Sequence, residues 1–368
     1  MRRYIYISLI LIILLVGCTS GEEVTTFVAS ENLDEMVIPA IEMEEPELPM
    51  PLNSSLAIYG ESPIFEEGLE DAWDLTIVFP GAVIYHGGLY HMFYNGLTFN
   101  RGITGGGIGY AVSANGVEWF RMADTPILTW DDTIGENDWL RASSATIEDD
   151  NTWVLYLSSV PRNIIEEFPR IWRATAPAPN GPWTFDDIPL LEPGETGEWD
   201  YYGVEDPVVL KTDAGYLMYY LNSRFDNRRG LTGIGLATSA DGVSWIKYDD
   251  PGTAERFSMS DPIFLYEGDT AGYDAIQAYF VWQDSQGFSM LYGTGRNTTN
   301  DMLYMTSLDG IVWNAPFEEP VFSTDDVAFL GNFFAPKVVF VDGQYLVYLY
   351  GSDGAQSFGD IYLATVAQ

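Results

Sequence analysis

The chain has 368 residues, of which 47% are hydrophobic and 15% aromatic, enough for one large domain or two small ones with a sizeable core. Its 54 Asp and Glu residues far outnumber its 16 Lys and Arg residues, which gives a formal net charge of −38 at pH 7. Such a surface repels polyanions, because binding a phosphate backbone requires Lys and Arg to displace counterions, so nucleic-acid binding is not expected.

Residues 1–18 have the features of a secretory signal. Arg2 and Arg3 precede an apolar stretch from Tyr4 to Val16, which is shorter than a usual membrane span. This pattern predicts a signal peptide and not a transmembrane helix.

The end of this segment, Leu15-Val16-Gly17-Cys18, resembles the bacterial lipobox. The resemblance implies cleavage before Cys18 and lipidation of its sulfur, which would attach the protein to a membrane of the cell envelope, outside the cytoplasm. The alternative is an ordinary signal peptide with a chance cysteine. Because Cys18 is the only cysteine, no internal disulfide is expected.

The segment from residue 19 to residue 52 carries nine acidic side chains, four prolines and no Lys or Arg. This composition predicts a disordered, self-repelling tether. The globular domain is then expected to span residues 53–368.

A short motif recurs five times in the globular part, with its prolines 58 to 73 residues apart. Its copies are "SPIF" at 62–65, "TPIL" at 125–128, "IPLL" at 188–191, "DPIF" at 261–264 and "EPVF" at 319–322. A second motif is a strand, an Asn-Gly or Asp-Gly turn and a strand carrying Trp. It occurs as "SANGVEW" at 113–119, "SADGVSW" at 239–245 and "SLDGIVW" at 307–313.

Each repeat also contains an upstream hairpin with an aromatic-rich second arm, such as "GYLMYYLNS". Each unit is therefore predicted to be a four-stranded antiparallel meander, the size of one propeller blade. The last unit stops before its own Pro-Ile-Phe strand, whereas "SPIF" at 62–65 has no unit of its own. The sequence thus predicts an all-β, five-bladed β-propeller whose ring is closed by an N-terminal strand.

Two adjacent carboxylates, Glu205 and Asp206 in "GVEDP", stand at the start of the third inner strand. The inner strands can be aligned through the aromatic residue that follows each hairpin turn. The positions matching Asp206 are Pro80, Ser143, Ala278 and Ala335, and those matching Glu205 are Phe79, Ala142, Gln277 and Phe334. The acidic pair is unique to one blade, so both residues are candidates for catalysis. Alternation along a strand predicts that only one of them faces the channel mouth.

An aromatic residue next to an aspartate recurs in the loops that lead into the inner strands. The pairs are Trp73-Asp74, Trp199-Asp200, Tyr273-Asp274 and the inverted Asp138-Trp139. Asp74 and Asp274 are candidates for a second catalytic carboxylate, and Trp73, Trp199, Asp200 and Asp274 are candidates for substrate binding. The alternative is structural: aspartates that cap loops and tryptophans that pack blades together.

Arg141 and Gln277, near the starts of two inner strands, are further candidates for holding a ligand. The alternatives are a salt bridge for Arg141 and an amide that satisfies a turn for Gln277. His86 and His91 are the only histidines, too few for a histidine metal site or a confident catalytic triad. No loop has a recognisable calcium spacing, so no cofactor is expected, although a Ca²⁺ ion in the channel is left open.

The succession "IGYAVSANGVEW", "GVEDPVVL", "GYLMYYLNS" and "IGLATSADGVSW" resembles the five-bladed propeller superfamily of glycoside hydrolases, including families 43, 32 and 130. The similarity covers about residues 56–368. The family 43 acid and base positions fall on Pro80, Ser143 and Glu205 or Asp206, so two of the three carboxylates are missing, and family 32 meets the same difficulty.

The segment "GVEDP" looks most like that of family 130, the mannoside phosphorylases and hydrolases, in which the Asp is the proton donor. The matching residue is Asp206, and Val208 stands where that family usually has Arg. Without a basic cluster for phosphate, hydrolysis is favoured over phosphorolysis.

Two functions follow from this comparison. The first is an extracellular, lipid-anchored and monomeric glycosidase-like propeller in which Asp206 or Glu205 protonates the leaving oxygen and a loop carboxylate is its partner. The second is a non-catalytic glycan-binding or structural propeller without the full carboxylate set. The sequence identifies neither the sugar nor the linkage.

Overall fold

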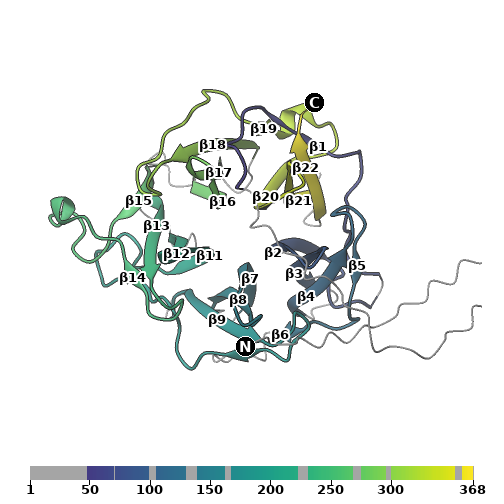
Figure 1. Cartoon of the computed structure of the whole chain (residues 1–368), viewed down its shortest axis with the longest axis horizontal. Helices are drawn as coiled ribbons and strands as arrows, with labels where there is room; N and C mark the ends of the chain where they lie inside the picture. Colours follow the sequence, from purple (N-terminus) through teal and green to yellow (C-terminus); the bar gives the residue numbers. More distant parts are fainter. Residues whose placement is uncertain are drawn as a thin grey trace, which may run out of the picture. The chain divides into compact units, whose positions relative to one another are not determined.

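The computed structural model describes residues 48–69, 71–98, 105–129, 139–161, 167–222, 231–267, 275–295, 300–352 and 359–367. Within these ranges the strands form five antiparallel sheets around a central axis (Figure 1). This is the five-bladed β-propeller that the repeats predict. Cys18 lies outside the described residues, as does most of the segment predicted to be a tether.

Each blade begins with an inner strand near the axis, and the following strands lie progressively farther out (Figure 1). The first blade consists of β2 (Ile77–His86), β3 (Leu89–Thr98), β4 (Gly105–Ser113), β5 (Phe120–Arg121) and β6 (Leu128–Thr129). The second consists of β7 (Trp139–Ile147), β8 (Trp153–Val160), β9 (Arg170–Ala176) and β10 (Thr184–Phe185). The third consists of β11 (Val204–Thr212), β12 (Gly215–Asn222), β13 (Leu231–Ser239), β14 (Ile246–Lys247) and β15 (Pro262–Glu267).

The fourth blade consists of β16 (Ala275–Asp284), β17 (Gly287–Gly295), β18 (Asp301–Ser307) and β19 (Phe322–Ser323). The fifth consists of β20 (Asn332–Val341), β21 (Gln344–Ser352), β22 (Asp360–Val366) and β1 (Leu56–Ile58). The described helices are single 3₁₀ turns, η3 (Pro251–Thr253) and η4 (Thr324–Asp326). Accordingly, no described helix is long and apolar enough to cross a membrane.

The outer strand of the fifth blade comes from the N-terminal part of the domain. β1 pairs antiparallel with β22, with Leu56 opposite Val366. The sequence placed this strand at 62–65, but there only Phe65 forms an isolated bridge, with Ile361. The last residue of the other motif copies pairs in the same way with the third strand of its blade: Leu128 with Ile108, Leu191 with Ile171, Phe264 with Ile234 and Phe322 with Met302. The motif therefore anchors an apolar side chain on each blade.

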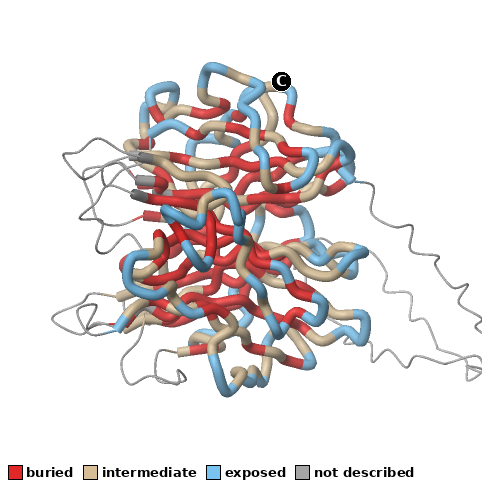
Figure 2. Tube along the Cα trace, turned by 90° about the vertical axis from the view of Figure 1, so that its left-hand side faces the viewer, coloured by how far each residue is buried: buried red, intermediate tan, exposed pale blue. Residues whose placement is uncertain are grey.

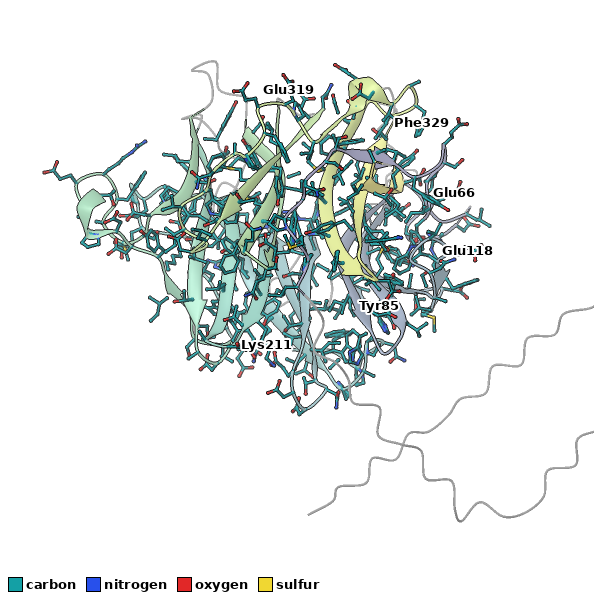
Figure 3. All side chains as sticks on the ribbon, turned by 45° about the horizontal axis from the view of Figure 1, so that its top comes forward. Glu66, Tyr85, Glu118, Lys211, Glu319 and Phe329 are labelled. Atoms are coloured by element: carbon teal, nitrogen blue, oxygen red, sulfur yellow. The ribbon has the colours of Figure 1, made fainter. Side chains whose placement is uncertain are left out.

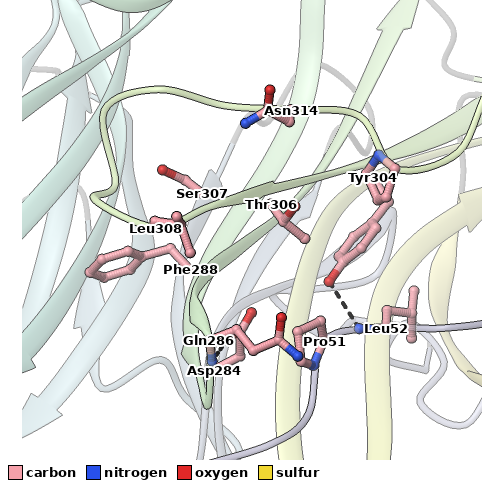
Figure 4. A pocket seen from close by; sticks show the side chains of 11 residues that line it. Pro51, Leu52, Asp284, Gln286, Phe288, Tyr304, Thr306, Ser307, Leu308 and Asn314 are labelled. Carbon is pink, nitrogen blue, oxygen red and sulfur yellow. Dashed lines mark hydrogen bonds between the residues drawn. The ribbon is translucent and has the colours of Figure 1, made fainter.

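The compact domain begins at Glu47, before the predicted boundary at residue 53. The reason is that Leu52 is buried in the apolar cluster between the fourth and fifth blades. Its backbone N–H donates to the Tyr304 hydroxyl at 2.9 Å, beside a cavity of about 220 Å³ (Figure 4). The Tyr345 hydroxyl likewise donates to the carbonyl oxygen of Met50 at 2.6 Å.

The core lies between the blades. Buried residues concentrate in the strands and exposed ones in the connections (Figure 2). The apolar clusters each join two neighbouring blades, as Tyr94 of the first and Tyr348 of the fifth do. Fully burying one large apolar side chain stabilises the fold by about 1.5–3 kcal/mol, so this packing holds adjacent blades together.

Candidate functional site

The described inner strands all contain a β-bulge close to their first residues. The register shifts fall between Pro80 and Ala82, Ala142 and Ser144, Glu205 and Val208, Ile276 and Ala278, and Phe334 and Lys337. A bulge adds an unpaired residue and redirects the neighbouring side chains. We call this end of the channel, where the inner strands begin, the mouth.

The register corrects the sequence alignment of the second blade. Its hairpin between Ile147 and Trp153 is one residue longer than the corresponding hairpins of the other blades. Counting back from the turn, Arg141 and not Ala142 lies at the level of Glu205. A guanidinium and a carboxylate therefore occupy equivalent places on adjacent blades.

Arg141 forms an ion pair with the acidic pair. Its Nη2 lies 2.5 Å from Glu205 Oε2 and 3.5 Å from Asp206 Oδ1. The Glu205 side chain is fully buried, whereas that of Asp206 is 27% exposed. Burial acts to lower the pKa of Arg141, but the charges of Asp206 and Glu205 outweigh it, so the pKa is raised. The salt bridge, which was the structural alternative for Arg141, is thus present.

The backbone of Asp206 is fixed in the left-handed region, with φ of 53°. A non-glycine residue there costs about 1–3 kcal/mol and needs support from its surroundings. Here the Asp206 N–H donates to Ser158 Oγ at 2.8 Å, and its carbonyl oxygen accepts from the Tyr279 hydroxyl at 2.6 Å. These bonds hold Asp206 as the exposed member of the pair while Glu205 stays buried.

Lys337, which the sequence did not single out as a site residue, crosses the channel at this level. Its Nζ donates to the carbonyl oxygen of Ser143 at 2.7 Å, which joins the fifth blade to the second. The side chain is buried, and burial lowers its pKa to about 8, although the charge of Asp206 acts in the opposite direction. The available sequence signal was that Lys337 is one of only three lysines and stands at the level of Val208.

A cavity of about 170 Å³ lies beside Arg141, between the first two blades. Phe79, Trp139 and Phe334 supply its aromatic walls, and the rings of Phe79 and Phe334 are 5.5 Å apart. Phe79 and Phe334 are the residues that replace an acid at this level. Within the described part of the chain, Arg141 Nε and Ser143 Oγ are buried without a hydrogen-bond partner. The mouth therefore combines apolar ring faces with available donors.

Trp73 and Asp74 brace the first blade. The Trp73 ring stacks on Tyr94, with ring centroids 5.6 Å apart. Asp74 is buried and its Oδ2 lies 3.0 Å from Arg121 Nη2. Among the described residues, the ion-pair partner of Asp74 is Arg121, whereas that of Asp206 is Arg141.

Trp199 and Asp200 repeat the arrangement in the third blade. Trp199 stacks on Tyr220 at 5.5 Å between ring centroids, and Asp200 Oδ2 lies 2.6 Å from Lys247 Nζ. Both residues are buried. Both residues thus make the contacts of the structural alternative, in which an aromatic-Asp pair packs against and braces its own blade.

Two further candidates cannot be placed at the mouth. Asp274 and the side chain of Gln277 lie outside the described residues. The bulge of the fourth blade begins one position earlier, so that Ala278 and not Gln277 lies at the level of Glu205. Among the described residues, no group of three His, Cys, Asp or Glu side chains could hold a metal ion.

The described strands form a five-bladed β-propeller with the side chains of the mouth at one end of its channel. No protein-family model matches the chain, and no curated protein matches its sequence. Solved structures do resemble it, although each is only 14–17% identical, so the likeness shows the fold alone.

Three of these structures belong to different glycoside hydrolase families. The first comes from work on family 130 of mannoside phosphorylases, a family described as containing glycoside hydrolases that target β-1,2 mannosidic linkages in Candida mannan. It is 17% identical to this chain, with a TM-score of 0.59, and the match covers 86% of this chain and 96% of that one. A family 117 glycoside hydrolase of Zobellia galactanivorans has 15% identity and a TM-score of 0.58, covering 85% and 90%. A thermostable family 43 glycoside hydrolase has 14% identity and a TM-score of 0.58, covering 79% and 91%.

Proposed function

We propose that the domain binds an oligosaccharide at the mouth. A sugar ring would lie against the aromatic walls formed by Phe79, Trp139 and Phe334, with its hydroxyls bonded to Arg141 and Asp206. The observation that carries this proposal is the cavity itself, because a sugar needs a flat apolar surface beside a few polar groups. The fold shared with glycoside hydrolases supports it.

Replacing Phe334 with Ala is expected to weaken glycan binding at least about tenfold, because it removes one wall of the cavity. The full chain is screened on an oligosaccharide panel that includes β-1,2-mannosides, and binding is quantified by calorimetry. Phe120→Ala is the control, since Phe120 is 65% exposed and lies in β5, away from the mouth. Equal affinities for parent and Phe334→Ala would contradict the proposal.

A second candidate function is hydrolysis of the bound glycan, with Asp206 as the proton donor. It is favoured by the partly exposed carboxylate of Asp206, on a backbone that is fixed by two hydrogen bonds. A second carboxylate is required, about 5 Å away for a retaining enzyme and about 6.5–9.5 Å away for an inverting one. Asp274 remains the candidate for this role.

If the domain is a hydrolase, Asp206→Asn is expected to lower the turnover number by about 10²–10⁴, because it removes the proton donor. Release of reducing ends measures this loss, and calorimetry shows whether the glycan still binds. Full activity in Asp206→Asn would exclude the residue from the mechanism. A parent protein that binds glycan but never cleaves it would favour the non-catalytic alternative.

A further inference from the structure

A larger cavity, of about 330 Å³, lies where the first and fifth blades meet at the other end of their inner strands. We call it the base cavity. Tyr85 is near the end of β2, six residues after Phe79 at the mouth, and Asp342 is in the turn that follows β20. At about 3.3 Å per residue this separates the two sites by about 20 Å. Figure 3 labels Tyr85 in the lower half of the domain, next to the end of a yellow strand of the fifth blade.

Three tyrosines from separate segments line the base cavity: Tyr59, Tyr85 and Tyr90. Tyr59 is 50% exposed and Tyr85 is 41% exposed, so both side chains are accessible to a ligand. Tyr90 is buried against Tyr85, with ring centroids 4.8 Å apart. A tyrosine offers a flat apolar face with a hydroxyl at its edge, which suits the apolar face and polar rim of a sugar ring.

The repeat shows that the Tyr90 hydroxyl is unusual. At the equivalent position of the third blade, the Tyr216 hydroxyl donates to Glu148 Oε2, and in the fifth blade the Tyr345 hydroxyl donates to Met50 O. The Tyr90 hydroxyl bonds to none of the described residues. Burial, aided by Tyr85 and Asp342, raises the pKa of Tyr90, so the hydroxyl stays protonated at neutral pH. It is left as a donor at the cavity.

The charge of the lining favours a neutral ligand. Asp342, Gln344 and Asn115 provide a carboxylate and two amides, and the described lining contains no Lys, Arg or His. An anionic ligand would face Asp342 and a domain of strongly negative charge without a counter-ion. An apolar peptide side chain would leave the carboxylate and the tyrosine hydroxyls without partners. A polyhydroxylated neutral ligand satisfies both groups.

We propose that the base cavity is a second carbohydrate-binding site, which holds a neutral sugar residue. The ring stacks on Tyr59 and Tyr85, and its hydroxyls bond to Asp342, Gln344 and the Tyr90 hydroxyl. The site is separate from the mouth and does not require that the protein cleave a glycan. It would hold one part of a polysaccharide while another part lies at the mouth.

The test uses the full chain and a panel of neutral oligosaccharides and polysaccharides, with binding measured by calorimetry and by retardation in polysaccharide-containing gels. The Tyr59→Ala/Tyr85→Ala double variant is expected to bind at least one of these glycans at least about tenfold more weakly than the parent. Tyr90→Phe removes only the hydroxyl and is expected to weaken binding of the same glycan severalfold. Tyr59 and Tyr85 are both exposed, so replacing them with Ala should leave the fold intact. Leu308→Ala is the control, because Leu308 is 85% exposed.

The outcomes separate this site from the mouth. Binding that persists in Phe334→Ala but falls in the double tyrosine variant supports the base cavity even if the mouth proposal fails. The base-cavity proposal would be overturned if the parent and the double variant bound every glycan with the same affinity. It would also be overturned if the parent bound no glycan. Binding of an apolar peptide that depends on Tyr59 and Tyr85, without such glycan binding, would overturn the sugar assignment.

Discussion

Replacing Glu205 with Ala is expected to lower the free energy of unfolding by about 3–5 kcal/mol. The Glu205 side chain is fully buried, and its Oε2 lies 2.5 Å from Arg141 Nη2. Its removal leaves the guanidinium with the Asp206 carboxylate, at 3.5 Å, as its one ion-pair partner among the described residues. Urea denaturation at neutral pH measures the difference in unfolding free energy.

The chain offers a matched control in the Arg170–Glu192 ion pair. Its N–O distance is 2.6 Å, but the two side chains are 35% and 58% exposed. Glu192→Ala is therefore expected to cost no more than about 1 kcal/mol. Replacing Arg141 and Glu205 together with Leu should recover part of the lost stability, because the guanidinium and the buried carboxylate are then removed together. If Glu205→Ala lowered the unfolding free energy no more than Glu192→Ala does, burial would not increase the contribution of the Arg141–Glu205 pair to stability.

Replacing Lys337 with Met is expected to reduce the change of the unfolding free energy with pH in the alkaline range. Burial lowers the pKa of Lys337 to about 8, whereas its ordinary value is 10.5. Between these values the unfolded chain holds a proton that the folded protein has released. The unfolding free energy of the parent should therefore rise between about pH 8 and pH 10.5, by about 3 kcal/mol in total.

The charged groups that act on Lys337 are Asp206 and Arg141, and its Nζ lies 5.4 Å from the centre of the Phe280 ring. Met also removes the hydrogen bond to the Ser143 carbonyl oxygen. This loss changes the unfolding free energy by the same amount at every pH, so it does not affect the pH dependence. The buried tyrosines titrate in both proteins, so subtracting the two curves removes their effect. Parallel curves for parent and Lys337→Met would show that Lys337 is not held at a lowered pKa.

The fold could be predicted because its repeat is local. Each copy of the Asn-Gly or Asp-Gly turn is made by residues close in sequence: Asn115 Oδ1 accepts from the backbone N–H groups of Val117 and Glu118. Asp241 makes the equivalent bonds to Val243 and Ser244. Three of the repeats contain such a turn, every repeat contains an aromatic-rich strand, and the five repeats fix the number of blades.

The site could be predicted only in part, because it depends on register. The acidic pair and Arg141 were identified, but an alignment that assumes equal hairpins places Ala142 where Arg141 lies. Lys337 was missed because its partner, Ser143, is 194 residues away in sequence. The ion pair of the buried Asp74 with Arg121 could not be predicted either, because the two residues are 47 positions apart in sequence.

The pairing of β1 with β22 makes the fifth blade depend on both ends of the domain. The first four blades consist of consecutive strands, so each can form from one continuous stretch of chain. The fifth blade cannot, because Leu56 pairs with Val366. Contacts so distant in sequence are formed slowly. Completion of the fifth blade is therefore expected to be the last step in closing the ring, wherever the chain folds.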